Sequence, residues 1–169
     1  MDVLSHGLWG SIGFGQQNKN RFWESFLFGI MPDFLSYGIF FIMLMSGISQ
    51  DLDWESSSGQ VAFIPQYVST LYTITHSLVV FSFVFIVLWF IYKEPVYPAM
   101  AWGLHIIMDI FTHADGFFPT PFLWPLLDFR ISGVTWSEPS IFIPNLVLIS
   151  IFYVWFFMIN KKKGEKPIE

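Results

Sequence analysis

The chain has 169 residues, of which 54% are hydrophobic, 21% are aromatic and only 12% are charged. A soluble domain is about one quarter charged, so this composition excludes an ordinary soluble globular protein and predicts apolar surface that faces lipid. The chain has no cysteine, which excludes disulfide bonds and thiolate metal sites. No nucleic-acid partner is predicted.

Hydrophobic stretches divide the chain into one short and four long segments. The short stretch, Val3–Phe14, predicts a tilted or half-inserted helix. Each of the four longer stretches could cross about 30 Å of hydrocarbon as a helix; they are Phe22–Ile48, Val61–Tyr92, Val96–Ala114 and Pro139–Asn160. No repeat and no second domain is visible, so we expect a single all-α domain over residues 1–169. This domain is a polytopic integral membrane helical bundle with four long transmembrane helices plus the short N-terminal helix.

The basic residues predict how this bundle is oriented. If the four long spans alternate in direction, all but one of the eight Lys and Arg residues fall on one side. These are Lys19, Arg21, Lys93, Lys161, Lys162, Lys163 and Lys166. Arg130 alone lies on the opposite side, together with the acidic stretch Asp51–Glu55. Because positive charge stays in the cytoplasm, we predict a cytoplasmic C-terminus and an external acidic loop.

Six ionisable side chains lie deep within the predicted helices: His6, Asp33, His76, His105, Asp109 and His113. The last three follow one another at intervals of four residues, so they share one face of a helix. Ionisable groups at membrane depth are costly, and they need partners, a water-filled cavity or a metal ion. Imidazole and carboxylate together suit zinc or a similar divalent ion, so the inventory predicts a metal site.

Pro32, in the stretch GIMPDFLSYG, predicts an irregularity in its helix. Proline has no N–H and clashes with the carbonyl four residues earlier, so we expect a kink or a break near Phe28. Irregular backbone within a membrane is tolerated only where it is buried in protein or lines a wet cavity. The carboxylate of Asp33, directly after the proline, is therefore expected to point into such a cavity.

Simpler interpretations stay open for several of these residues. His76 could hydrogen-bond across helices as a purely structural residue, and Asp33 could pair with a histidine. His113 could be an ordinary interfacial side chain. Arg130 could bind a phosphate through its planar guanidinium, or it could simply pair with Asp128 at the surface.

The deep polar residues lie in motifs that occur in a recognisable order: LSHG, PDF, THSLVV, GLHIIMDIFTHADG, LWP and FRISG. Over residues 1 to about 140, this series resembles the bacterial membrane-bound metal-dependent hydrolases. The order His, Asp, His, HxxxD is also similar to that of zinc-dependent phospholipase C and the fungal single-strand nucleases. The resemblance implies a first metal shell of Asp33, His76, His105 and Asp109.

The same resemblance implies a second ion, held by His6 and bridged to the first through Asp109, with His113 in the place of another ligand. The soluble enzymes bind three zinc ions and end on a further HxxxE-type pair. No histidine follows His113 here, so we expect one or two ions.

These observations predict a metal-dependent hydrolase of the bacterial inner membrane. It would cleave a phosphoester of a membrane lipid or lipid-linked substrate with metal-activated water. Asp33 is the predicted proton acceptor, and Arg130 is the predicted contact for the headgroup phosphate. Ser77 lacks the glycine turn of a serine nucleophile, which argues against a covalent route.

Two alternatives belong to other classes of protein. Histidine and aspartate at mid-depth on a broken helix also occur in ion or metal transporters, although a chain this short would then be expected to form a homo-oligomer. The third possibility is a structural membrane protein that merely binds a metal.

Overall fold

A computed structural model of the chain describes residues 1–47, 64–115 and 118–162, and every regular element within these ranges is helical. The elements are α1 (Val3–Phe14), α2 (Lys19–Asp33), the π-helix η1 (Phe34–Gly38), α3 (Ile39–Met45), α4 (Gln66–Thr75), α5 (Leu78–Tyr92), the 3-10 turn η3 (Tyr97–Ala99), α6 (Met100–Thr112) and α7 (Pro139–Lys162). The all-α prediction is confirmed for this part of the chain. The predicted outer loop Asp51–Glu55 and the end of the lysine-rich tail lie outside it.

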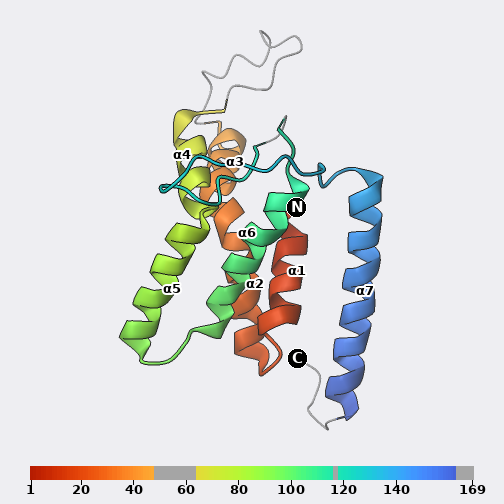
Figure 1. Cartoon of the computed structure of the whole chain (residues 1–169). Coiled ribbons are helices and arrows are strands. Elements are labelled where there is room, and N and C mark those ends of the chain that lie inside the picture. Colours follow the sequence, from red (N-terminus) through yellow and green to blue (C-terminus); the bar gives the residue numbers. More distant parts are fainter. Residues whose placement is uncertain (48–63, 116–117, 163–169) are drawn as a thin grey trace.

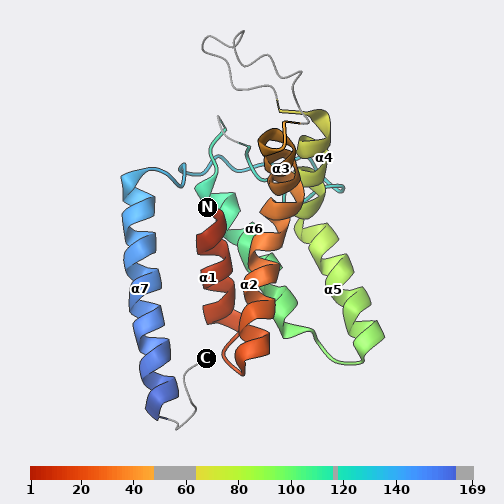
Figure 2. The ribbon, with the colours of Figure 1, turned by 180° about the vertical axis from the view of Figure 1, so that it is seen from behind.

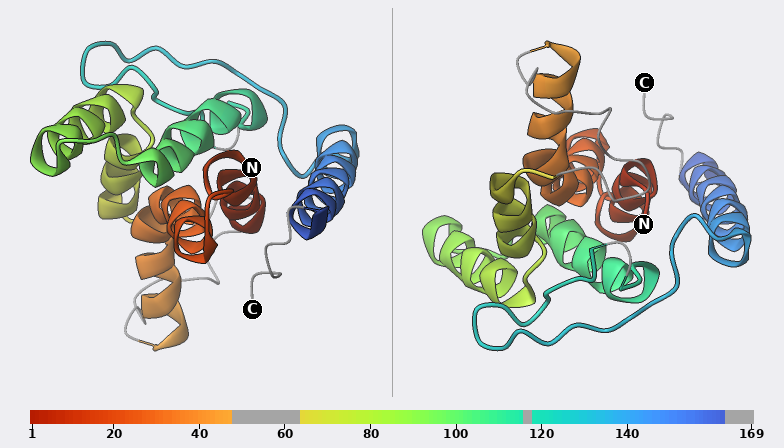
Figure 3. Two further views of the ribbon diagram at one scale, coloured as in Figure 1. Left: turned by 90° about the horizontal axis from the view of Figure 1, so that it is seen from below. Right: turned by 90° about the horizontal axis from the view of Figure 1, so that it is seen from above.

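The helices α1, α2 and α6 form the centre of the molecule (Figure 1). The pair α4 and α5 flanks this centre on one side, and α7 stands on the other, as the view from behind also shows (Figure 2). Seen end-on, α1 lies between α7 and the remaining helices, and it contacts α2, α6 and α7 (Figure 3). The shortest predicted segment is therefore a central packing element.

Two helical segments are long and apolar enough to cross a membrane, namely Lys19–Met45 and Pro139–Met158. The helices α4 and α5 qualify together as a third, although they are bent by 59° where they meet. Their apolar side chains are largely exposed, as lipid-facing surface requires; Phe90 is 71% exposed and Phe83 is 68% exposed. The described part of the chain thus has two helices, or three with the bent pair, that could span a membrane, and the count of four long spans is not confirmed.

The predicted third span, Val96–Ala114, differs from expectation because its regular helix is short. Pro98 lies in the 3-10 turn η3, and His113 has extended backbone, so α6 keeps only 13 residues. At 1.5 Å per residue, such a helix is about 20 Å long, less than the hydrocarbon thickness. Eight of its residues are buried, so α6 lies within the bundle.

Pro32 does not break its helix near Phe28. The helix continues through Pro32 to Asp33 and then widens into the π-helix η1. Side-chain hydroxyls donate to the Pro32 carbonyl, from Ser36 at 2.9 Å and from Thr75 at 3.3 Å. The irregularity therefore takes the form of a π-turn directly after Asp33, a feature that often occurs at functional sites.

The predicted second span is interrupted at His76. The helix α4 ends at Thr75, His76 is its C-cap, and α5 begins at Leu78. Ser77 caps α5, because its Oγ accepts hydrogen bonds from the N–H groups of Val79 and Val80 at 3.2 Å. The Leu78 N–H donates to the carbonyl of Phe122 at 2.9 Å, so the segment between α6 and α7 supplies an acceptor at the break.

The helices α1 and α2 approach one another until their backbones touch. A Cβ built on Gly29 would lie 2.6 Å from the carbonyl oxygen of His6, and one on Gly10 would lie 2.7 Å from that of Ser25. Small residues at such crossings let membrane helices gain van der Waals contact. This contact also sets where His6 lies relative to α2.

We predict that Gly29→Ala destabilises the protein by about 1–3 kcal/mol, because backbone atoms cannot move aside as a flexible side chain can. The matched control is Gly13→Ala in α1, where the new Cβ meets its nearest atom at an ordinary 3.8 Å. Thermal unfolding in detergent compares the two variants. Equal stability of both variants would show that α1 and α2 do not cross as described.

Candidate metal centre

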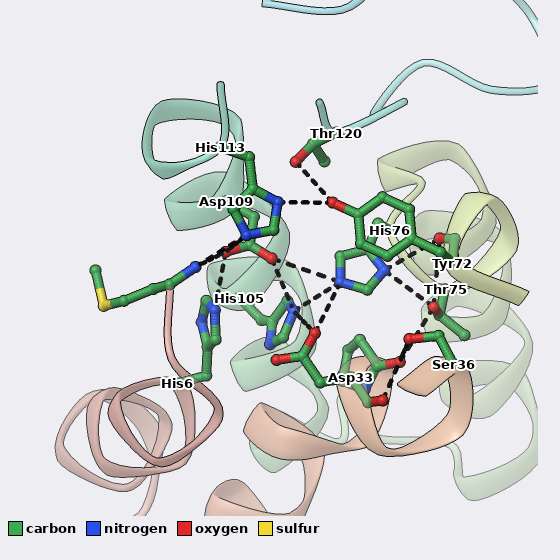
Figure 4. Close-up of polar contacts among 12 residues, drawn as sticks. His6, Asp33, Ser36, Tyr72, Thr75, His76, His105, Asp109, His113 and Thr120 are labelled. Carbon is green, nitrogen blue, oxygen red and sulfur yellow. Dashed lines mark hydrogen bonds and ion pairs between the residues drawn. The ribbon is translucent and has the colours of Figure 1, made fainter. Parts of the chain in front are cut away.

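Four buried side chains from three parts of the fold converge in the centre of the bundle: Asp33, His76, His105 and Asp109. Asp33 ends α2, His76 lies at the break between α4 and α5, and the other two lie one turn apart on α6 (Figure 4). Each offers one ligand atom, and these atoms all lie within 4.8 Å of one another. The group could hold a metal ion.

The spacing of the ligand atoms fits a tetrahedral ion. Nε2 of His76 lies 3.0 Å from Nε2 of His105, 3.4 Å from Oδ1 of Asp33 and 3.5 Å from Oδ2 of Asp109. Nε2 of His105 lies 3.7 Å from Oδ1 of Asp33 and 3.2 Å from Oδ2 of Asp109. Four ligands placed 2.0–2.2 Å from a zinc-like ion at tetrahedral corners are roughly 3.4 Å apart. The measured separations scatter around this value.

Hydrogen bonds on the far side of each ring fix its tautomer. Nδ1 of His105 lies 2.7 Å from the carbonyl oxygen of Gly29, and Nδ1 of His76 lies 3.0 Å from that of Tyr72. A carbonyl can only accept, so each Nδ1 carries a proton, and in its neutral form each ring therefore presents an Nε2 lone pair to the centre. Orientation of a ligating histidine by a backbone carbonyl is the usual arrangement around a metal.

The centre contains acceptors without the donors to satisfy them. Two Nε2 lone pairs face one another, two carboxylates lie beside them, and Oδ2 of Asp109 has no hydrogen-bond donor among the described residues. Asp109 is completely buried, and Asp33 is 8% exposed. Buried anions are costly unless they are paired or bind a metal. A divalent cation would balance both carboxylates and use all four lone pairs.

The other oxygen of Asp109, Oδ1, faces a second group of side chains. Nε2 of His6 lies 2.9 Å from it, Nε2 of His113 lies 3.6 Å from it, and the amine of Met1 also contacts it. The His6 ring stacks on His105 with centroids 3.6 Å apart. Asp109 thus presents one oxygen to each group, but His6 and His113 do not belong to the four residues whose ligand atoms lie within 4.8 Å of one another. Their role at a second ion stays a prediction.

Several residues that frame the centre were missed by the sequence reasoning. The hydroxyl of Tyr72 lies 2.8 Å from Nδ1 of His113 and donates to the carbonyl of Phe118 at 2.9 Å, and its ring stacks on His76. Thr75 Oγ1 lies 3.0 Å from Nδ1 of His76. The stretch YTITH could have indicated this role, since Tyr72 precedes His76 by one helical turn.

The structure does not bring Arg130 to the centre. Its Nε donates to Oδ1 of Asp128 at 3.0 Å on the exposed surface, which is the simpler of the two interpretations. Asn145 of α7 also lies apart from the four ligands. Its side chain bonds Ser5 and Trp9 at 2.8 Å each, and so ties α7 to α1.

Comparison of the chain with protein-family models, with curated proteins and with solved structures finds no match. The conclusions about this centre rest on its geometry.

We predict that His105→Ala lowers metal affinity by more than the roughly 10–100-fold that loss of a supporting partner costs. It should also lower thermal stability, because the buried carboxylates of Asp33 and Asp109 would lose the metal ion that balances their charge. Metal content after purification, measured by mass spectrometry of the elements, tests this. Arg130→Ala serves as the control, since it removes an exposed side chain.

If His105→Ala retained the wild-type metal content, the four-ligand centre would be wrong. A chelator should reproduce the stability loss in the wild-type protein and should have no further effect on the variant.

Proposed function

We propose that the protein is a membrane-embedded, metal-dependent hydrolase that cleaves a phosphoester of a lipid or lipid-linked substrate. The observation that carries this proposal is the pair of Nε2 lone pairs of His76 and His105, 3.0 Å apart and flanked by two buried carboxylates. Such a donor set suits zinc, which takes imidazole nitrogen and carboxylate oxygen in a tetrahedral site. A catalytic ion supplies an activated water and polarises a phosphoryl oxygen.

Asp33 is the proposed proton acceptor. Its contacts with His76 and His105 use Oδ1, which leaves Oδ2 able to take a proton from water. The side chain of Asp33 is also 10% exposed, while those of His76, His105 and Asp109 are fully buried. Water and substrate would therefore reach the centre on the side of Asp33.

The membrane supports the choice of a lipid substrate. The helices around the centre expose large apolar side chains such as Phe83 and Phe90, which favours a substrate that enters from the bilayer. Arg130 remains the proposed contact for a headgroup phosphate; to bind one, it would have to exchange its surface partner Asp128.

One specific observation favours the transporter alternative. Two of the segments that contribute ligands are irregular, at the π-helix after Asp33 and at the 59° bend beside His76, and transporters bind ions at discontinuous helices. Uptake of zinc into sealed proteoliposomes, without phosphoester hydrolysis, would replace the hydrolase proposal by this one.

We further propose the orientation that the basic residues predict, in the bacterial inner membrane. The turn that joins α1 and α2, the loop that joins α5 and α6, and the C-terminal end of α7 lie at one end of the molecule (Figure 1). Lys19, Arg21 and Lys93 lie at this end, and Arg130 lies in the segment that crosses the other end. The distribution supports a path that traverses the molecule four times, with the basic end in the cytoplasm.

The chain lacks cysteine, so single substitutions test this orientation directly. Glu138→Cys should react with a membrane-impermeant thiol reagent in intact cells, and Glu94→Cys should react only after permeabilisation. Both glutamates are exposed, and they lie at opposite ends of the molecule. The opposite labelling pattern would reverse the proposed orientation.

For catalysis, we predict that Asp33→Asn lowers turnover by about 10²–10⁴-fold while the protein still folds, because an amide cannot accept the proton. The matched control is Asp115→Asn, which changes an exposed aspartate. The assay is a mass-spectrometric screen of total membrane lipid incubated with zinc-loaded protein. A screen without any product that depends on both metal and Asp33 would contradict the proposed function.

A further inference from the structure

A cluster of three aromatic rings lies beside the metal centre and includes Tyr37 of η1. The Tyr37 ring meets Tyr72 of α4 edge-on, with ring centroids 5.9 Å apart, and it meets the ring of Phe118 at 5.5 Å. Tyr72 and Phe118 also meet at 5.5 Å, so each ring touches the other two. Tyr72 stacks in addition on the ligand His76, with centroids 3.9 Å apart. A single ring therefore separates Tyr37 from a ligand of the centre.

The backbone places Tyr37 on the same side as Asp33. Tyr37 follows Asp33 by four residues, and residues four apart lie on one face of a helix. Between them the chain passes into the π-helix η1, whose wider turn keeps this spacing on nearly one face. The carboxylates of Asp33 and Asp109 both act electrostatically on the Tyr37 hydroxyl. Tyr37 thus lies beside Asp33, the least buried of the four ligands.

The hydroxyl groups of the two tyrosines differ in their partners. The Tyr72 hydroxyl donates to the carbonyl of Phe118 at 2.9 Å and lies 2.8 Å from Nδ1 of His113. The Tyr37 hydroxyl is buried as well, but it has no hydrogen-bond partner among the residues that the structure describes. A buried hydroxyl without a partner is costly, so a group that binds it would explain its presence.

We infer that Tyr37 is a further catalytic residue, whose hydroxyl donates a hydrogen bond to a phosphoryl oxygen of the substrate. The four ligands offer lone pairs, whereas a phosphoryl oxygen is itself an acceptor and needs a donor such as this hydroxyl. A donor that is already in place where negative charge develops stabilises the transition state. Tyr37 keeps its proton throughout, while Asp33 takes the proton of the attacking water. The inference rests on the proposed function for the reaction, but not for the binding of an oxyanion.

The first test compares the thermal stability of two phenylalanine variants in detergent. Tyr72→Phe should lower the melting temperature, because the Phe118 carbonyl loses a hydrogen-bond donor. Tyr37→Phe should leave the melting temperature unchanged or raise it, because the hydroxyl that it removes has no partner among the described residues. If Tyr37→Phe lowered the melting temperature as much as Tyr72→Phe does, the hydroxyl would have a structural partner and the inference would be overturned.

The second test measures the binding of inorganic phosphate to the zinc-loaded protein by isothermal titration calorimetry. Tyr37→Phe should weaken this binding by about 10–100-fold, the loss expected for one hydrogen bond to a charged group, while the zinc content stays that of the wild-type protein. The matched control is Tyr97→Phe, which changes an exposed tyrosine in η3 and should keep the wild-type affinity. A wild-type protein that does not bind phosphate, or equal affinity in Tyr37→Phe, overturns the inference.

Cleavage of total membrane lipid by the same variants separates this inference from the proposed function. Tyr37→Phe should lower kcat by about 10²–10³-fold, as the loss of one preorganised donor does in other enzymes. Weaker phosphate binding in Tyr37→Phe, without any lipid cleavage by the wild-type protein, supports Tyr37 as the contact for an oxyanion and counts against the hydrolase. Cleavage at the wild-type rate in Tyr37→Phe leaves the hydrolase standing and overturns the role of Tyr37.

Discussion

The arrangement of the bundle depends on an electrostatic requirement at its centre. His76 and His105 point Nε2 lone pairs at one another across 3.0 Å, and two carboxylates lie beside them in a site that water hardly reaches. Like partial charges in such surroundings repel, since little solvent screens them. A cation between them would give all four side chains a common partner. The free energy of metal binding would then contribute directly to the stability of the fold.

The irregular parts of the backbone serve this centre. The π-helix after Asp33, the break at His76 and the contact of Gly29 with α1 each interrupt regular helix or regular packing. The carbonyl of Gly29 orients His105, and α4 ends directly before His76, so that the His76 ring can turn toward α6. Irregular backbone is tolerated at these places because it is buried within the protein, where other groups satisfy its hydrogen bonds.

The sequence predicted the residues of the centre better than the backbone that carries them. The four-residue spacing of His105 and Asp109 needs only a helix, and α6 supplies one. The break at His76 could not be read from composition, because the apolar run continues through it. There Ser77 caps the start of α5, and the Phe122 carbonyl accepts from the Leu78 N–H. The short length of α6 depends likewise on Pro98 and on tertiary contacts of His113. Tyr72 and Asn145 acquire their roles only through partners that lie far away in the sequence.

The most direct test of this account is the X-ray absorption spectrum of the protein loaded with one equivalent of zinc. We predict about four nitrogen and oxygen ligands at 2.0–2.2 Å, with the outer-shell scattering of two imidazole rings. His76→Ala should remove the contribution of one ring, because His76 presents its Nε2 to the centre. A spectrum of hydrated zinc without imidazole scattering, or one that His76→Ala leaves unchanged, would contradict the metal centre.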